Sequence, residues 1–433
     1  MHLSPRVRRT ASVVVAALAI TGCGTAGDER PAAAPGGVTG STAASVGPSP
    51  PPAPGTTAPD PAPPCTSPLD ALSRRERIAQ LFTVGVSSMA DARRAVLEEK
   101  VGGIFLGGDV VGEVVSGDGL ARLKQESPFP LLVSIDEEGG RVSRVSRFAG
   151  PLPSARVMAA TMSPEQVRGA AFDRGRFLHG IGVTVDFAPS VDVSDQPDGA
   201  VIGDRSFSPD PDQVTRYARA FSQGLLDSGV TPVFKHFPGH GSSSGDSHHG
   251  SVSVPPLDRL LARDLRPFAE LAGTPGAAMM VGHPRVPGLT GVDRPASLSP
   301  AAYRLLRDGR AYGGPPYDGV IFTDDLSGMR AVTDAFPLPQ AVAEALVAGV
   351  DSPLWISTAQ LGAALDAVER AVAEGYLSRK RLDESLARMA RLRGIPGCLG
   401  GPTTGGTPGS GALAGSTPSP DLPPRPGLPP LPR

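Results

Sequence analysis

Short apolar runs recur through the middle of the chain, and each is followed by a segment with helical character. The runs cover residues 81–86, 103–106, 130–135, 183–189, 232–236, 278–282, 320–323 and 350–355. Eight such runs, taken as strands that alternate with helices, predict an α/β fold, a parallel (β/α)8 TIM-type barrel forming a single domain.

The helical segments carry their own signals. Residues 163–166 (SPEQ) combine an N-cap serine, a proline in the first turn and a glutamine three residues after the cap. Apolar residues recur with helical spacing over 258–271 and 340–348, and 382–392 reads as a final amphipathic helix. A doubly wound open sheet would alternate in the same way, but no glycine-rich dinucleotide fingerprint follows the first strand.

The N-terminus predicts export. Arg6, Arg8 and Arg9 precede a short apolar run at 11–20, which is too short to span a bilayer and fits a signal peptide over residues 1–22. Residues 20–23 (ITGC) resemble a bacterial lipobox, in which Cys23 is lipidated; the alternative is an ordinary secretory signal. We expect a protein anchored by lipid to the outer face of the bacterial cell membrane.

Composition sets the domain boundaries. Residues 23–64 and 399–433 are rich in Pro, Gly, Ala, Ser and Thr without apolar periodicity, so we expect a disordered tether and a disordered C-terminal tail. The folded domain is predicted at 65–398. Cys65 and Cys398 lie at its edges and form either a disulfide or two separate thiols. The net charge of −2 and the lack of a basic run argue against a nucleic-acid partner.

Polar side chains mark the ends of several predicted strands: Asp136, Lys235, His236, His283 and Asp324. A barrel gathers the carboxyl ends of its strands around one site. The densest cluster is 235–241 (KHFPGHG), followed by 245–249 (GDSHH). Histidines and carboxylates on a glycine-rich loop are suited to proton transfer, so this loop predicts catalysis.

Three further motifs contribute candidates. Residues 135–144 (IDEEGGRVSR) place acids and arginines around a Gly-Gly turn, and 202–207 (IGDRSF) carries a central arginine. Residues 321–326 (IFTDDL) put a carboxylate directly after a buried strand, where it needs a partner.

Together these motifs resemble the family 3 glycoside hydrolases, in particular β-N-acetylglucosaminidases of the bacterial cell-wall recycling type. The resemblance covers about residues 72–392, and its most specific part is the KHFPGHG segment with its GDSH loop. The loop separates this branch from related β-glucosidases, which take their acid/base from a second domain. The residues after 392 have the composition of a tail.

The resemblance implies roles for individual residues. Asp324 matches the nucleophile, His248 the general acid/base, and Asp246 the carboxylate that orients it. The residues that match sugar-binding positions are Asp136, Arg144, Arg205, Lys235 and His236. His240, His249, Asp325 and Asp192 receive no firm role. Neither a cofactor nor a metal is implied.

Elementary chemistry supports these roles. A retaining glycosidase needs a nucleophile and a proton donor that later acts as base, and an imidazole populates both protonation states near neutral pH. Arg205 and Lys235 are expected to keep nearby carboxylates, including Asp324, ionised. Two features depart from the family pattern: an additional Gly328 after the nucleophile, and the stretch 349–355 at the eighth strand, which differs from the usual apolar continuation.

The expected substrates are terminal GlcNAc units of peptidoglycan fragments, such as GlcNAc joined to an anhydro-muramic residue. β-Glucosidase activity and phosphorolysis by the same fold remain alternatives, as does a lipoprotein that binds glycans without cleaving them. A zinc site built from the histidine cluster is disfavoured because helical spacings such as His-Glu-x-x-His do not occur. Any protein partner is unknown.

Overall fold

The computed structural model describes residues 67–291 and 293–397. The predicted signal peptide, tether and C-terminal tail, with Cys23, Cys65 and Cys398, lie outside these residues. Their lipidation and disulfide pairing therefore stay predictions.

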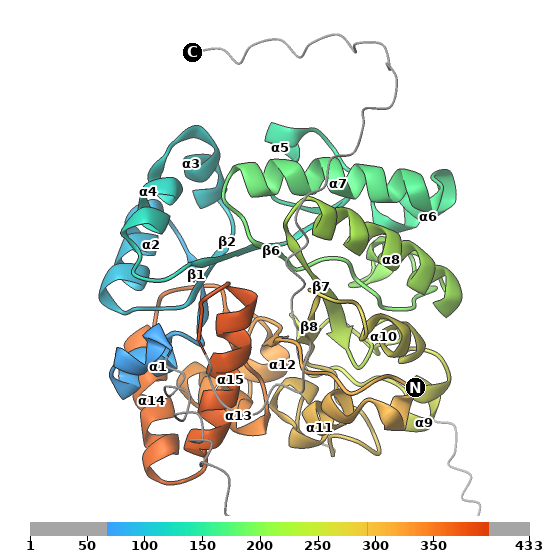
Figure 1. Cartoon of the computed structure of the whole chain (residues 1–433). Helices are drawn as coiled ribbons and strands as arrows, with labels where there is room; N and C mark the ends of the chain where they lie inside the picture. Colours follow the sequence, from blue (N-terminus) through green and yellow to red (C-terminus); the bar gives the residue numbers. More distant parts are fainter. Residues whose placement is uncertain (1–66, 292, 398–433) are drawn as a thin grey trace, which may run out of the picture. The chain divides into compact units, whose positions relative to one another are not determined.

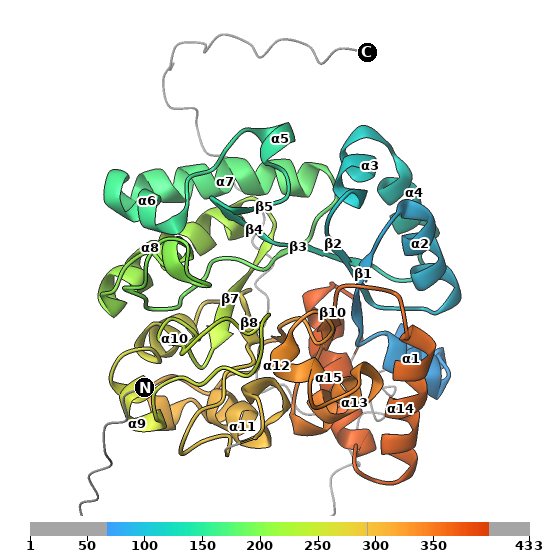
Figure 2. The same cartoon turned by 180° about the vertical axis from the view of Figure 1, so that it is seen from behind.

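Eight parallel strands form one sheet with helices around it, as Figures 1 and 2 show from opposite sides. The strand order is β10-β1-β2-β3-β6-β7-β8-β9, and a parallel bridge from Phe322 to Ser352 brings β9 next to β10. This nearly closed barrel confirms the predicted fold, and every predicted run contains or overlaps one strand. The strands are β1 (Thr83–Val86), β2 (Gly103–Leu106), β3 (Leu132–Ile135), β6 (Val185–Asp186), β7 (Thr231–Phe237), β8 (Ala278–Val281), β9 (Ile321–Thr323) and β10 (Leu354–Trp355).

The helices surround the sheet and connect successive strands. They are α1 (Arg74–Ala79), α2 (Met89–Arg93), α3 (Val110–Ser116), α4 (Gly119–Glu126), α5 (Ser146–Ala149), α6 (Ala155–Thr161), α7 (Pro164–Gly180), α8 (Pro211–Asp227), α9 (Leu257–Ala262), α10 (Arg266–Leu271), α11 (Pro300–Asp308), α12 (Arg330–Thr333), α13 (Leu338–Ala348), α14 (Leu361–Ala373) and α15 (Arg379–Leu392). A small antiparallel ribbon, β4 (Glu137–Gly139) and β5 (Val142–Ser143), follows β3.

Local signals explain where helices begin. Ser163 caps α7 by accepting from the N–H of Gln166, and the side chain of Gln166 accepts from the N–H of Ser163, as predicted. The prediction of one helix over 258–271 is wrong, because α9 ends at Ala262 and α10 restarts at Arg266. Pro267 lies in the first turn of α10, and in a continuous helix it would remove a hydrogen bond and clash with the preceding turn.

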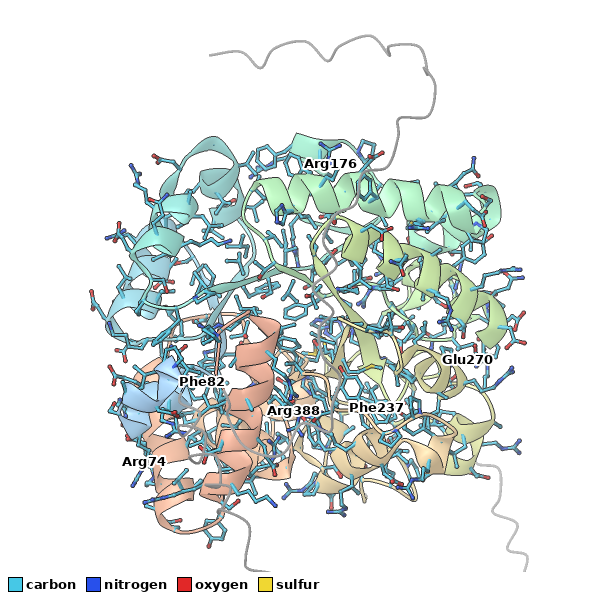
Figure 3. The ribbon with its side chains drawn as sticks, viewed as in Figure 1. Arg74, Phe82, Arg176, Phe237, Glu270 and Arg388 are labelled. Atoms are coloured by element: carbon cyan, nitrogen blue, oxygen red, sulfur yellow. The ribbon has the colours of Figure 1, made fainter. Side chains whose placement is uncertain are left out.

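Aromatic rings fill the space inside the barrel and around it. The ring of Phe187, just after β6, lies 5.9 Å from that of Phe105 on β2 and 5.3 Å from that of Phe322 on β9. Phe82 and Phe237, both labelled in Figure 3, pack against Trp355 and Phe268. The interior is therefore a packed core, and a site can form only at its ends.

One buried carboxylate joins β10 to two helices. Asp351, fully buried, accepts from the guanidinium of Arg307 on α11 and from Arg381 and Arg388 on α15; Arg388 lies near the middle of the view in Figure 3. Burial raises the pKa of Asp351, but the three arginines outweigh it, and the pKa lies below its usual value. Asp351, in the unusual 349–355 stretch, is thus a structural anchor.

We predict that Asp351→Asn lowers the free energy of unfolding by about 3 kcal/mol, because it leaves buried guanidinium groups without a counter-charge. Urea denaturation followed by circular dichroism would measure this. Asp318→Asn is the matched control: Asp318 also binds Arg388 but is largely exposed, and its loss should cost less than about 1 kcal/mol. Equal effects of the two substitutions would contradict the anchor.

Candidate active site

The strand ends converge on a small cavity of about 160 Å³. Seven of the eight predicted catalytic and sugar-binding residues line it, and the eighth, Asp246, lies behind His248. The lining consists of Asp136, Glu138, Val142, Arg144, Val201, Ile202, Arg205, Lys235, His236, His240, Ser247, His248, Asp324 and Met329. The barrel therefore brings together residues that are up to 193 positions apart in sequence, from Asp136 to Met329.

A network of buried and partly buried ions forms one wall. Nζ of Lys235 lies 2.7 Å from both Asp136 and Glu138. Arg205 holds Glu138 with two hydrogen bonds of 2.8 and 2.7 Å. Burial raises the pKa of Glu138, but Arg205 and Lys235 lower it by more, so its pKa lies below the ordinary value and the carboxylate stays ionised. Burial lowers the pKa of Lys235, yet Asp136 and Glu138 raise it above its ordinary value.

Glu138 was not among the predicted site residues. Its only signal in the sequence is its position two residues after Asp136. It lies in β4, and the turn from β4 to β5 depends on glycine: Gly139 and Gly140 have positive φ, and a Cβ on Gly139 would lie 2.4 Å from the carbonyl of Pro153. This turn brings the chain back toward the cavity at Arg144, which lies 4.0 Å from Asp136.

His236 is oriented from behind by Asp192. Its Nδ1 lies 2.7 Å from Asp192, whose other oxygen accepts from the N–H of His240 at 2.6 Å. Burial raises the pKa of Asp192, but the two histidines outweigh it and lower the pKa to about 2. The sequence left Asp192 without a firm role, and the structure makes it the partner of His236.

Asp324 follows β9 and is mostly buried at the cavity wall. Its carboxylate lies 3.9 Å from Nε2 of His236 and accepts from the N–H of Asp325. Burial raises its pKa, but His236 first, then His283, and to a smaller extent Lys235 outweigh it, so the pKa is below its ordinary value. Lys235 thus helps to keep Asp324 ionised, as expected, while Arg205 does the same for the nearby carboxylate of Glu138.

Asp325 shapes the segment after Asp324. Its carboxylate accepts from the N–H groups of Ser327 and Gly328 at 2.8 Å each. A Cβ on Gly328 would lie 2.5 Å from that carboxylate, so this close approach requires glycine. The segment then directs Met329 to the cavity wall. The additional Gly328 therefore leaves Asp324 in the site.

His248 lies on the loop after β7 and is half exposed. Its Nδ1 is 2.7 Å from Asp246, which also accepts from the N–H of His248. Burial raises the pKa of Asp246, but the contacts with His248 lower it by more. The pKa therefore lies below its ordinary value, and the carboxylate is ionised. An ionised carboxylate only accepts, so Nδ1 carries a proton and Nε2 is the nitrogen available for proton transfer.

A second cavity of about 600 Å³ adjoins the first and extends toward the ends of β1, β2 and β10. Five residues line both cavities: Asp136, Arg144, His248, Asp324 and Met329. Among residues 67–291 and 293–397, there is no group of three or more His, Cys, Asp or Glu side chains arranged to hold a metal ion. Within the same residues, the helices include none that is both long and apolar enough to cross a membrane.

A parallel barrel with ionic hydrogen-bonding groups, a buried aspartate and a histidine–aspartate pair around one cavity has the features of a glycoside hydrolase. The chain belongs to glycosyl hydrolase family 3, since residues 73–392 match the model of its N-terminal domain. It is 51% identical over 337 residues to Beta-hexosaminidase LpqI of Mycobacterium tuberculosis (strain ATCC 25618 / H37Rv), covering 76% of this chain and 84% of that protein.

Solved structures agree with this membership. A family 3 glycosyl hydrolase from Mycobacterium smegmatis str. MC2 155 superposes with a TM-score of 0.73 at 51% identity, covering 75% of this chain and 98% of that one. A family 3 β-N-acetylglucosaminidase from Paenibacillus sp. str. FPU-7 gives 0.69 at 32% identity, covering 79% and 66%. The chain is therefore an enzyme of the glycoside hydrolase class.

We predict a pH-dependent cost for Asp192→Asn. Because the pKa of Asp192 is depressed to about 2 in the folded state, against about 3.9 unfolded, its contribution to stability is full above pH 4 to 5 and is lost as pH falls toward 2. The difference in unfolding free energy between wild type and variant should shrink by about 2 kcal/mol between pH 5 and pH 2.

Urea denaturation at several pH values would measure it. Asp195→Asn, at an exposed neighbouring position, should change stability by less than about 0.5 kcal/mol. A difference for Asp192→Asn that is constant with pH would contradict the assignment.

Proposed function

We propose that this chain is a retaining β-N-acetylglucosaminidase that removes terminal GlcNAc units from peptidoglycan fragments. Support for the sugar comes from relatives named β-hexosaminidase and β-N-acetylglucosaminidase. The observation that carries the reaction is that Asp324 and His248 line the same two cavities.

The small cavity suits a single terminal sugar. The cavity wall offers N–H donors from Lys235, Arg205, Arg144 and His236, and acceptor oxygens from Asp136. A polyhydroxylated ring needs both. The adjoining cavity of about 600 Å³ leaves room for the remainder of the glycan.

In the first step Asp324 attacks the anomeric carbon while His248 donates the proton on Nε2 to the leaving oxygen. The bond to the aglycone breaks and a glycosyl–aspartate ester forms. In the second step neutral His248 takes a proton from water, the water attacks the same carbon, and Asp324 leaves as carboxylate. Asp246 holds Nδ1 protonated throughout and stabilises the imidazolium.

The function is tested by comparing aryl β-GlcNAc with aryl β-glucoside, each with and without phosphate. Preferential cleavage of the GlcNAc substrate, independent of phosphate, is expected. Dependence on phosphate would indicate a phosphorylase, and activity only on the glucoside would indicate a β-glucosidase. Absence of turnover by folded protein would favour a glycan-binding lipoprotein.

We predict that Asp324→Ala lowers kcat by at least about 10³-fold, because the covalent step loses its nucleophile. Added azide should restore part of the activity on an activated aryl glycoside and yield a glycosyl azide, detectable by mass spectrometry. Asp325→Ala, at the neighbouring carboxylate that accepts from the N–H groups of Ser327 and Gly328, should show no rescue. Wild-type rates in Asp324→Ala would exclude this residue as nucleophile.

His248→Ala should affect substrates according to their leaving group. Phenyl β-GlcNAc needs a proton on its departing oxygen, whereas dinitrophenyl β-GlcNAc does not. We expect kcat/KM to fall by about 10²-fold or more on the phenyl substrate and far less on the dinitrophenyl one. His249→Ala is the matched control, as His249 lines neither cavity. Equal losses on both substrates would show that His248 is not the leaving-group acid.

We further propose that the enzyme is exported and held by lipid at Cys23 on the outer face of the cell membrane, where peptidoglycan fragments are accessible. The support is the sequence pattern of residues 1–23. Cell fractionation of Cys23→Ala should find the protein released from the membrane fraction. Unchanged membrane retention would reject the lipid anchor.

A further inference from the structure

The loop that carries His248 is held at its tip by a single buried residue. Between Ser244 and Ser251, only Ser247 is buried, with 3% of its surface exposed. Its neighbours are at the surface: the His248 side chain is 52% exposed and that of His249 is 84% exposed. A serine buried between exposed neighbours indicates that the loop docks through this residue.

Ser247 docks on the segment that follows Asp324. Its carbonyl oxygen accepts from the N–H of Ala331 at 3.1 Å, and its hydroxyl donates to the sulfur of Met329 at 3.4 Å. Ala331 lies in the first turn of α12, and Met329 lines both cavities. The two contacts therefore join the loop of the proton donor to the segment of the nucleophile.

The base of the same loop is fastened separately. Ser244 and Ser253 exchange two hydrogen bonds, of 2.8 and 3.1 Å, and residues 252–254 pair with Arg285. The base sets where the loop leaves the barrel. The tip contact sets how close His248 approaches Asp324.

The partner segment is itself rigidly held. Asp325 accepts from Ser327 and Gly328, and its own carbonyl accepts from Nε2 of buried His283 at 2.8 Å. Gly328 has no room for a side chain. Ser247 thus docks on a fixed surface, and its position is transmitted to His248, the next residue along the chain.

We propose that the hydrogen bond from the Ala331 N–H to the Ser247 carbonyl is a latch that sets the distance between acid/base and nucleophile. Ser247 and Ala331 are positioning residues: they hold His248 without donating to substrate. The inference rests on the proposed roles of His248 and Asp324. Misplacing a catalytic group by about 1 Å can cost about 10²-fold in rate, so one contact at this point is sufficient to matter.

The test replaces the hydrogen of the latch with the Cδ of a proline ring, which removes the donor and also pushes the Ser247 carbonyl away. Ala331→Pro eliminates the N–H at a position in the first turn of a helix, where proline is tolerated. Ala331→Ser retains the N–H and is the matched control. Both are assayed as full-length protein, with kcat/KM measured on phenyl and dinitrophenyl β-GlcNAc, because kcat/KM reports the step in which the leaving group departs.

For Ala331→Pro we expect kcat/KM on the phenyl substrate to fall at least about fivefold, the factor that one lost hydrogen bond represents, with little change on the dinitrophenyl substrate. Ala331→Ser should behave as wild type. Amide hydrogen exchange of residues 244–250 should speed up in Ala331→Pro alone. Ser247→Ala, which loses only the weak contact to sulfur, should show a smaller loss of the same kind.

Equal loss on both substrates, or unchanged exchange in the loop, would overturn the latch. Thermal melting of both Ala331 variants identifies a general folding defect, which would also lower both rates together and reject the proposal. His248→Ala in the same assay distinguishes a failure of the latch from a failure of the proposed role of His248. If it is selective for the phenyl substrate and Ala331→Pro is not, the latch fails while the proposed function stands.

Discussion

The ion network of Asp136, Glu138, Arg205 and Lys235 is the constraint on which the site depends. Two acids from the segment after β3, a guanidinium from the loop after β6 and the Lys235 ammonium of β7 lie at contact distance. Glu138 and Lys235 are buried, and removing either would leave its partner charge uncompensated, which costs several kcal/mol. The segments after β3 and β6 are therefore held against β7 in one arrangement. Because these groups are ordered before substrate binds, their donors and acceptors can meet a sugar without reorganisation.

The two proposed catalytic groups occupy opposite environments. Asp324 is mostly buried and faces His236, and its pKa is lowered by the histidines around it, so it stays an ionised nucleophile. His248 is half exposed on a loop with a single carboxylate partner. A group that must gain and lose a proton in each cycle is suited to a site reached by water, and a nucleophile is suited to a shielded one.

Much of the site could be predicted from strand ends alone. Asp136, Lys235, His236 and Asp324 follow or end buried runs, and parallel strands necessarily gather such ends. The residues that were missed or unassigned act behind the lining residues. Glu138 returns to the cavity through a Gly-Gly turn, and Asp192 reaches His236 across 44 positions. Such contacts produce no recognisable pattern of residues along the sequence, because they depend on how loops fold back in space.

The sequence by itself determined the eight-fold alternation of strands and helices, since burial on both faces requires continuous apolar runs. It also determined the residue types available at each strand end. Only the tertiary structure decided that α9 and α10 are separate helices, that Asp351 anchors α11 and α15, and that Ser247 docks on Ala331. Each of these is set by the approach of segments distant in the chain, where the free energy comes from burial and pairing of particular atoms and not from local propensity.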